Sequence, residues 1–159
     1  MTITDVDTDH LRTAISVARN ARVNGNHPFG ATLVDSTGTQ VLAAENSVVT
    51  GRDVTGHAET NLVRQASGRF APSELAGFTL YTSTEPCAMC AGAIYWAGVG
   101  RVVYALGEDA LGEMTGANPE NPTLSLPCRE VFARGQREIT VDGPVDLPEA
   151  RAVHAGFWG

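Results

Sequence analysis

Apolar residues recur along the chain at two spacings, one typical of helices and the other of strands. The helical spacing comes first, in a segment that follows Thr8 and Asp9, two residues that can cap a helix. The residues of its apolar face are Leu11, Ala14, Ile15, Ala18 and Ala21. We therefore predict a helix over this segment, with Thr8 or Asp9 at its beginning.

Four segments further along the chain are predicted to be strands. They are residues 29–34, 41–46, 78–83 and 101–105. The first two are joined by residues 35–38, Asp-Ser-Thr-Gly, which is typical of a turn.

Helices are predicted between these strands. One begins near Thr55 or Gly56, and its inward-facing residues are Leu62, Val63 and Ala66. Another begins at Pro86, since proline is favoured in the first turn of a helix, and ends at about Ala97. The alternation of strands and helices indicates an α/β sandwich with helices on both faces of one sheet.

The last third of the chain has a different composition. Residues 107–127 are rich in Gly, Asn and Pro, and we predict one long loop, which in compact domains is usually functional or mobile. A last strand is predicted at 138–141 and a terminal helix from 148 to about 158. We expect one domain, residues 1–159, with 147–159 as a C-terminal tail.

Composition and charge exclude several classes of function. The chain has 159 residues, of which 18 are acidic and 11 basic, for a net charge of -7. All 11 basic residues are arginines, which excludes a Schiff-base lysine, a pyridoxal-phosphate enzyme and a lysine-bearing P-loop. The acidic balance argues against a broad phosphate-binding surface, because each phosphate contact needs a cation.

The location of the protein is also indicated by the sequence. Residues 1–7 are acidic where a signal peptide would be basic and then apolar, and the charge-free residues 86–100 are too few to span a bilayer. We therefore expect a cytoplasmic protein that makes no contact with a membrane. In a reducing compartment, the spacing of Cys87 and Cys90 suggests metal or redox chemistry more than a disulfide.

Two short motifs carry the chemistry, His57-Ala58-Glu59 and Pro86-Cys87-Ala88-Met89-Cys90. Cys87 and Cys90 are one helical turn apart, and a helix N-terminus there would favour their thiolates. With His57 they form a ligand set that suits zinc and leaves the fourth position open for water. Zinc would lower the pKa of that water, and Glu59 is placed to take and return its proton.

A structural zinc site is the alternative to a catalytic one, and it needs a fourth protein ligand. The candidates are Cys128, His10, His27 and His154. A redox Cys-x-x-Cys motif is a further alternative, but it explains neither His57 nor Glu59. The two upstream residues favour the catalytic zinc.

His-x-Glu followed by Pro-Cys-x-x-Cys resembles the signature of zinc nucleobase deaminases in the cytidine/deoxycytidylate deaminase superfamily. The resemblance extends in order across residues 28–105. It implies a three-layer α/β/α sandwich with a central five-stranded mixed sheet and one zinc ion per chain. It also implies hydrolysis of an exocyclic amine to a carbonyl with release of ammonia, and a homodimer.

The segments 28–31 and 92–97 resemble the guanine deaminase branch, which acts on free bases. Asn46 resembles the asparagine that hydrogen-bonds the base in this family, and Ala58 is a further candidate for substrate binding. Phe29 and Trp96 are predicted walls of the pocket, because a planar base gains from aromatic contacts. The expected substrate is a guanine- or cytosine-type base, or a heterocycle such as azacytosine or an aminotriazine.

tRNA-specific adenosine deaminases share the zinc motif, and editing of tRNA adenosine to inosine is the alternative function. Such enzymes need clustered cations. Arg129, Arg134 and Arg137 are interleaved with glutamates, and the apolar tail 147–159 resembles a segment that closes a pocket. Both features favour a small substrate and make a nucleic-acid partner unexpected.

Guanine-type relatives also carry a second acidic residue after the fourth strand. The candidates for it in this sequence are Asp109, Glu113 and Glu120, and none aligns clearly.

Overall fold

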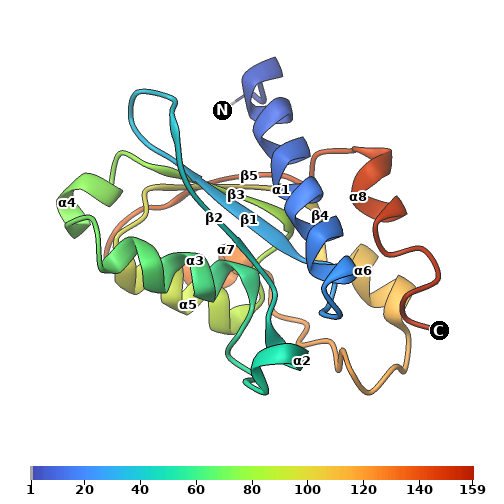
Figure 1. The fold of residues 1–159 in the computed structure, drawn as a ribbon. Coiled ribbons are helices and arrows are strands. Elements are labelled where there is room, and N and C mark those ends of the chain that lie inside the picture. Colours follow the sequence, from blue (N-terminus) through green and yellow to red (C-terminus); the bar gives the residue numbers. More distant parts are fainter. Residues whose placement is uncertain (1) are drawn as a thin grey trace.

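A five-stranded mixed sheet forms the centre of the protein in a computed structural model that describes residues 2–159 (Figure 1). The strands are β1 (Gly30–Val34), β2 (Gln40–Glu45), β3 (Thr79–Thr84), β4 (Arg101–Leu106) and β5 (Thr140–Asp142). Their order in the sheet is β2-β1-β3-β4-β5. β1 is antiparallel to both of its neighbours, whereas β3, β4 and β5 are parallel. The predicted number and mixture of strands are confirmed.

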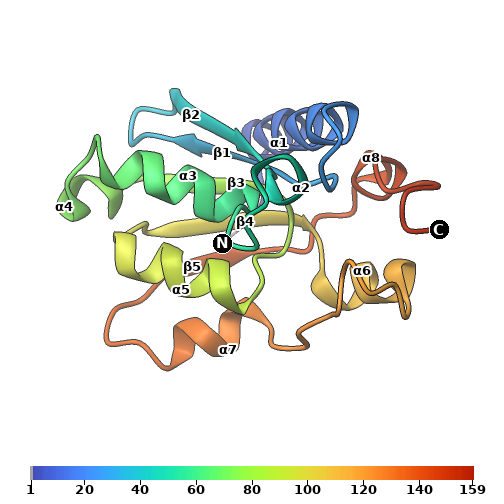
Figure 2. The same cartoon turned by 60° about the horizontal axis from the view of Figure 1, so that its bottom comes forward.

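Helices cover both faces of this sheet, which confirms the predicted three layers (Figure 2). One face packs against α1 (Asp5–Val23), α6 (Glu108–Thr115) and α8 (Pro148–Ala152). The other face packs against α3 (Ala58–Ser67), α5 (Ala88–Ala97) and α7 (Cys128–Ala133). Two further short helices are α2 (Val48–Gly51) and α4 (Pro72–Leu75). β3 and β4 are buried on both faces, because each lies between two helical layers.

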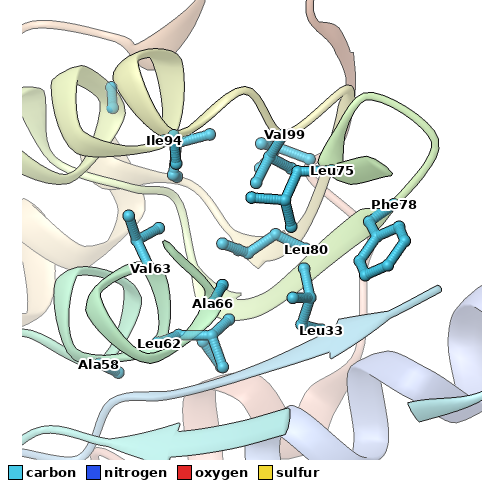
Figure 3. Close-up of a cluster of buried hydrophobic side chains, with 14 of the residues drawn as sticks. Leu33, Ala58, Leu62, Val63, Ala66, Leu75, Phe78, Leu80, Ile94 and Val99 are labelled. Atoms are coloured by element: carbon cyan, nitrogen blue, oxygen red, sulfur yellow. The ribbon is translucent and has the colours of Figure 1, made fainter. Parts of the chain in front are cut away.

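The core between the sheet and α3 and α5 sets the position of these two helices (Figure 3). Leu33 of β1 and Leu80 of β3 are fully buried, as are Leu62 of α3 and Ile94 of α5. Burying a side chain of this kind contributes roughly 1.5–3 kcal/mol. The core therefore holds both helices firmly, and with them their N-termini.

Helix α1 begins one turn before its predicted start. Its N-cap is Thr4, whose hydroxyl accepts from the Asp7 N–H at 3.1 Å while the Asp7 carboxylate accepts from the Thr4 N–H at 3.0 Å. This reciprocal pair satisfies two backbone donors at the helix start. The prediction that Thr8 or Asp9 caps the helix is therefore wrong, because the cap lies outside the apolar repeat.

Asp7 also joins α1 to the sheet. Its carboxylate accepts from the Tyr81 hydroxyl at 2.6 Å and from Arg101 at 2.9 Å and 3.2 Å. Arg101 in turn donates to Asp142 of β5 at 2.9 Å. Burial opposes ionisation of Asp7, but the hydrogen bonds from Arg101, Tyr81 and Thr4 outweigh it and lower the pKa of Asp7.

The C-terminal third departs most from the prediction. Residues 107–127 are not one loop, because Glu108–Thr115 form α6, and α7 directly after this segment was not predicted. The backbone N–H groups of Glu108 and Cys128, the first residue of each helix, donate to a side chain far away in the sequence. Hydrogen bonds between residues so far apart leave no periodic pattern in the sequence from which the two helices could be predicted.

The terminal helix is shorter than predicted. α8 ends at Ala152, and turns continue to Phe157 rather than a helix to about residue 158. Gly156 has φ +70°, a left-handed conformation that does not continue a helix. None of the helices formed by residues 2–159 combines the length and the hydropathy that crossing a bilayer requires.

Replacing Asp7 by Asn should lower the free energy of unfolding by about 1–3 kcal/mol at neutral pH, because Tyr81 and Arg101 lose a charged acceptor. The folded-state pKa of Asp7 is depressed, so its contribution is complete above the pKa of an unfolded aspartate, about 3.9, and declines progressively as the pH falls from there toward the lower folded-state pKa. Urea unfolding from pH 7 to pH 3 measures this loss. The control is Asp9→Asn, an exposed aspartate of the same helix. Equal midpoints for the two variants at pH 7 would contradict the assignment.

Candidate active site

Two helix N-termini meet beyond the carboxyl end of β3. His57 is the N-cap of α3, Cys87 is the N-cap of α5, and Cys90 lies in the first turn of α5. One ligand atom from each of the three lies within 4.8 Å of the others, and His57 Nδ1 is 3.5 Å from Cys87 Sγ. The fold thus brings together the three residues that the sequence predicts as metal ligands.

The pKa values of the two thiols shift in opposite directions. A hydrogen bond from Cys90 lowers the pKa of the Cys87 thiol, burial opposes this, and His57 adds to the lowering. The pKa of Cys90 is raised, because its thiol donates to Cys87 and is buried. A zinc ion would bind both sulfurs as thiolates, and the N-terminus of α5 favours their negative charge. Two sulfurs and one imidazole are the donor chemistry of zinc.

Glu59 lies in the first turn of α3, close to the ligand group but outside it. It is 5% exposed, and its Oε1 is 2.6 Å from the hydroxyl of Thr82 on β3. Burial raises the pKa of Glu59, and the Thr82 hydrogen bond partly offsets this. A carboxyl group whose pKa is raised holds a proton more readily, which suits it to carry a proton in both directions.

A cavity of about 470 Å³ opens beside these residues. His57, Glu59 and Cys87 line it, together with apolar side chains that give it a partly hydrophobic surface. These apolar side chains are Phe29, Val48, Val54, Met89, Leu111, Pro119, Pro122 and Leu124. The volume is within the range of small-molecule sites.

Comparison with known proteins assigns the chain to a protein family. Residues 4–106 match the family model described as the cytidine and deoxycytidylate deaminase zinc-binding region. The chain belongs to this deaminase family. It is a hydrolase that acts on C–N bonds, and His57, Cys87 and Cys90 can hold its one zinc ion.

Individual relatives of this deaminase differ in substrate. A probable cytosine deaminase from Schizosaccharomyces pombe is 40% identical over 98% of this chain and 94% of the relative. A tRNA-specific adenosine deaminase from Haemophilus influenzae is 32% identical over 68% of this chain and 62% of the relative. A solved structure of a guanine deaminase from Nitrosomonas europaea is 27% identical, with a TM-score of 0.75, over 96% of this chain and 84% of that one.

Asn46 and Phe29, both predicted to contact substrate, line the cavity of this deaminase. Asn46 is 1% exposed, and its Oδ1 accepts from the Val48 N–H at 3.0 Å. This hydrogen bond fixes the orientation of the amide and leaves its NH₂ group as a donor.

Two predicted substrate contacts are not at the cavity. Trp96 is 83% exposed on α5 and does not line the cavity, so the prediction that it forms a wall is wrong for this chain. The reason is the helical spacing. Ile94 points into the core, and a residue two positions later on the same helix points to the opposite side, so Trp96 faces outward. Ala58 is fully buried in the core at the start of α3, and its side chain does not line the cavity either.

The segment after β4 supplies acidic side chains to the cavity. Of the predicted candidates, Glu120 lines the cavity, whereas Asp109 and Glu113 do not. Glu108, which sequence reasoning missed, lines it as well. Burial, followed by the negative charges of Cys87 and Glu85, raises the pKa of Glu108 to about 7. Its place directly beyond a strand that is parallel to β3 is the signal that could have identified it.

The C-terminal tail packs against side chains that line the cavity. None of residues 147–159, all of which the structure describes, lines the cavity. Trp158 is buried, and its ring lies 6.0 Å from that of Phe29 and 5.4 Å from that of His27, both of which line the cavity. Trp158 Nε1 donates to His154 Nδ1 at 3.0 Å.

The candidate fourth ligands of a structural zinc site lie elsewhere. Within residues 2–159, none of them joins the group of His57, Cys87 and Cys90. His154 is hydrogen-bonded to Trp158, Cys128 is in the core, and the ring of His10 packs against that of Tyr81. His27 lines the cavity, 3.7 Å from Glu120, and burial lowers its pKa. The arrangement is therefore that of a three-ligand site.

Replacing Cys87 by Ala should abolish stoichiometric zinc binding, because it removes one of the three ligands. Metal analysis after dialysis against a weak chelator measures the zinc that each variant retains. Cys128→Ala is the matched control, since this third cysteine lies outside the ligand group, and it should keep one zinc per chain. Full metallation of Cys87→Ala would overturn the assignment.

Proposed function

We propose that this deaminase acts on a free nucleobase of the guanine or cytosine type, or on a related heterocycle such as azacytosine or an aminotriazine. The observation that supports this proposal most directly is the charge of the side chains that line the cavity. Among the described residues that line it are four glutamates, Glu59, Glu85, Glu108 and Glu120, and no arginine. Without an arginine or lysine side chain, such a cavity disfavours a phosphate-bearing substrate and favours a neutral or cationic ring.

The residues have distinct roles in this proposal. When bound, zinc lowers the pKa of a water molecule and so supplies the hydroxide nucleophile. Glu59 would take one proton of the attacking water and deliver it to a ring nitrogen, and would then transfer the second proton, from the hydroxyl group formed on the ring carbon, to the departing amine, which leaves as ammonia. Thr82 holds the Glu59 carboxyl group. The NH₂ group of Asn46 orients the ring, and Phe29 forms an aromatic wall.

Two further carboxyl groups are available to recognise the substrate. Glu108 and Glu120 line the same cavity as Asn46 and can accept hydrogen bonds from ring N–H or amino groups. Glu120 is among the predicted candidates for a second acidic residue after the fourth strand, and Glu108 is not.

Editing of tRNA adenosine is the alternative, and the relative from Haemophilus influenzae favours it. The positions of two arginines argue against it. Arg129 donates to the Tyr104 hydroxyl and to carbonyl groups near β5, and Arg137 donates to carbonyl groups at the end of α5. Both side chains are used within the fold and do not line the cavity.

A panel of substrates tests the proposal through release of ammonia by the zinc-loaded protein. The panel contains guanine, cytosine, adenine, azacytosine, an aminotriazine, the matching nucleosides and an anticodon stem-loop. We expect turnover of at least one free base, and a loss of about 10²–10⁴-fold in Glu59→Ala with zinc retained. Turnover of the stem-loop alone would refute the proposal. A rate in Glu59→Ala equal to that of the parent would refute the role proposed for Glu59.

We also propose that the partner of the chain is a second copy of itself, bound through α5. Met89, Gly92 and Trp96 share one face of this helix, and Met89 and Trp96 are 37% and 83% exposed. A Cβ atom added to Gly92 would meet nothing within 4 Å, so a second helix can approach closely there.

The cytoplasm remains the expected location of the protein. All three cysteines are free, which is consistent with a reducing compartment.

Replacing Trp96 by Glu should weaken self-association by roughly tenfold or more, the cost expected for a tryptophan at the centre of an interface. Light scattering over a series of protein concentrations measures the mass. Val23→Glu is the control, because Val23 is an exposed apolar residue at the end of α1. A monomeric parent, or equal masses for the two variants, would contradict the proposed interface.

A further inference from the structure

Glu85 directly follows β3 in the sequence and precedes the metal ligand Cys87. Both of its carboxylate oxygens accept hydrogen bonds from backbone N–H groups. Oε1 accepts from the Glu108 N–H at 3.1 Å, and Oε2 accepts from the Cys128 N–H at 2.9 Å. The residue is 8% exposed and lies two positions before Cys87. Neither the motifs of the sequence nor the proposed chemistry uses this carboxylate.

Its two partners are the ends of one segment. Glu108 is the first residue of α6, and Cys128 is the first residue of α7. The chain between them forms a wall of the cavity through Glu108, Leu111 and residues 119–124. One carboxylate therefore holds the beginning and the end of this wall, which we call the 108–128 wall, at a single point.

The same residue ties the wall to the metal ligands. The Glu85 N–H donates to the Leu106 carbonyl at 2.7 Å, which fixes the end of β3 against the end of β4. Pro86 and Cys87 follow directly, so the backbone that carries a metal ligand also carries the anchor of the wall. The distance between the two sides of the cavity then depends on Glu85.

The chemistry of the anchor requires a carboxylate. Both partners are N–H donors, and an ionised carboxylate offers only acceptors. An amide in its place would turn an NH₂ group toward one of the two N–H groups and lose that bond. The buried N–H group would then be left without a partner, which is costly.

We propose that Glu85 is a positioning residue, which holds both ends of the 108–128 wall against the metal ligands and so closes the substrate cavity. This inference rests on the proposed function for its kinetic consequences. The wall carries Glu108, Glu120 and apolar side chains that would contact the substrate, whereas Glu59 and the metal ligands lie on other elements. Loss of the anchor should therefore weaken substrate binding more than it slows the chemical step.

The test compares Glu85→Gln with Glu113→Gln, which changes the same charge on the exposed face of α6. In the zinc-loaded protein without substrate, we expect faster amide hydrogen exchange across residues 108–128 in Glu85→Gln only. On a base that the panel identifies, we expect a KM raised roughly tenfold or more, with kcat within about threefold and zinc retained.

A second pair of variants removes one donor and leaves Glu85 in place. Cys128→Pro lacks the N–H group at a helix position that proline tolerates, and Cys128→Ala loses the thiol alone. Cys128→Pro should accelerate exchange and raise KM, whereas Cys128→Ala should not. These variants keep the test available if Glu85→Gln does not fold.

Two results would overturn the proposal. One is exchange in Glu85→Gln and Cys128→Pro that equals exchange in their controls. The other is a fall in kcat with zinc loss and an unchanged KM, which would place the effect of Glu85 on the metal ligands. If no free base is turned over, the proposed function fails, but the exchange measurement still decides whether Glu85 anchors the wall.

Discussion

The convergence of two helix N-termini beyond β3 is the constraint on which the site depends. His57 begins α3 and Cys87 begins α5, so unpaired N–H groups and helix dipoles act together at one point and favour a thiolate. The position of that point is set by the core, where Leu62 and Ile94 hold the two helices against the sheet. Apolar packing thus determines the geometry of a polar site.

Burial controls the charge of the cavity. Glu59 and Glu108 face a thiolate and other carboxylates without an arginine nearby to pair with them, and the pKa of each is raised. Burial is the largest cause of both shifts, because it opposes the charged form of each carboxyl group. This is the setting that proton transfer to a leaving amine requires, and it explains why an acidic cavity serves a hydrolytic deaminase.

The outer side of the cavity is built from contacts between distant segments. Glu85 binds the N–H groups of Glu108 and Cys128, Trp158 supports Phe29, and the side chain of Asn118 donates to the Trp158 carbonyl. The tail and the segment after β4 stabilise one another in this way. The C-terminal third, which lies beyond the matched residues 4–106, thus contributes one side of the cavity through Glu108, Leu111 and residues 119–124.

The sequence by itself determined the layers of the fold, the mixed sheet, the zinc ligands His57, Cys87 and Cys90, and the deaminase family. These follow from periodicity and from short motifs, in which the interacting residues are close in sequence or belong to a fixed signature. The tertiary structure alone decided that Trp96 faces outward, that Glu108 rather than Asp109 or Glu113 reaches the cavity, and that α6 and α7 exist. Each of these depends on which helix face packs inward or on hydrogen bonds between segments far apart in the chain, and neither leaves a local pattern.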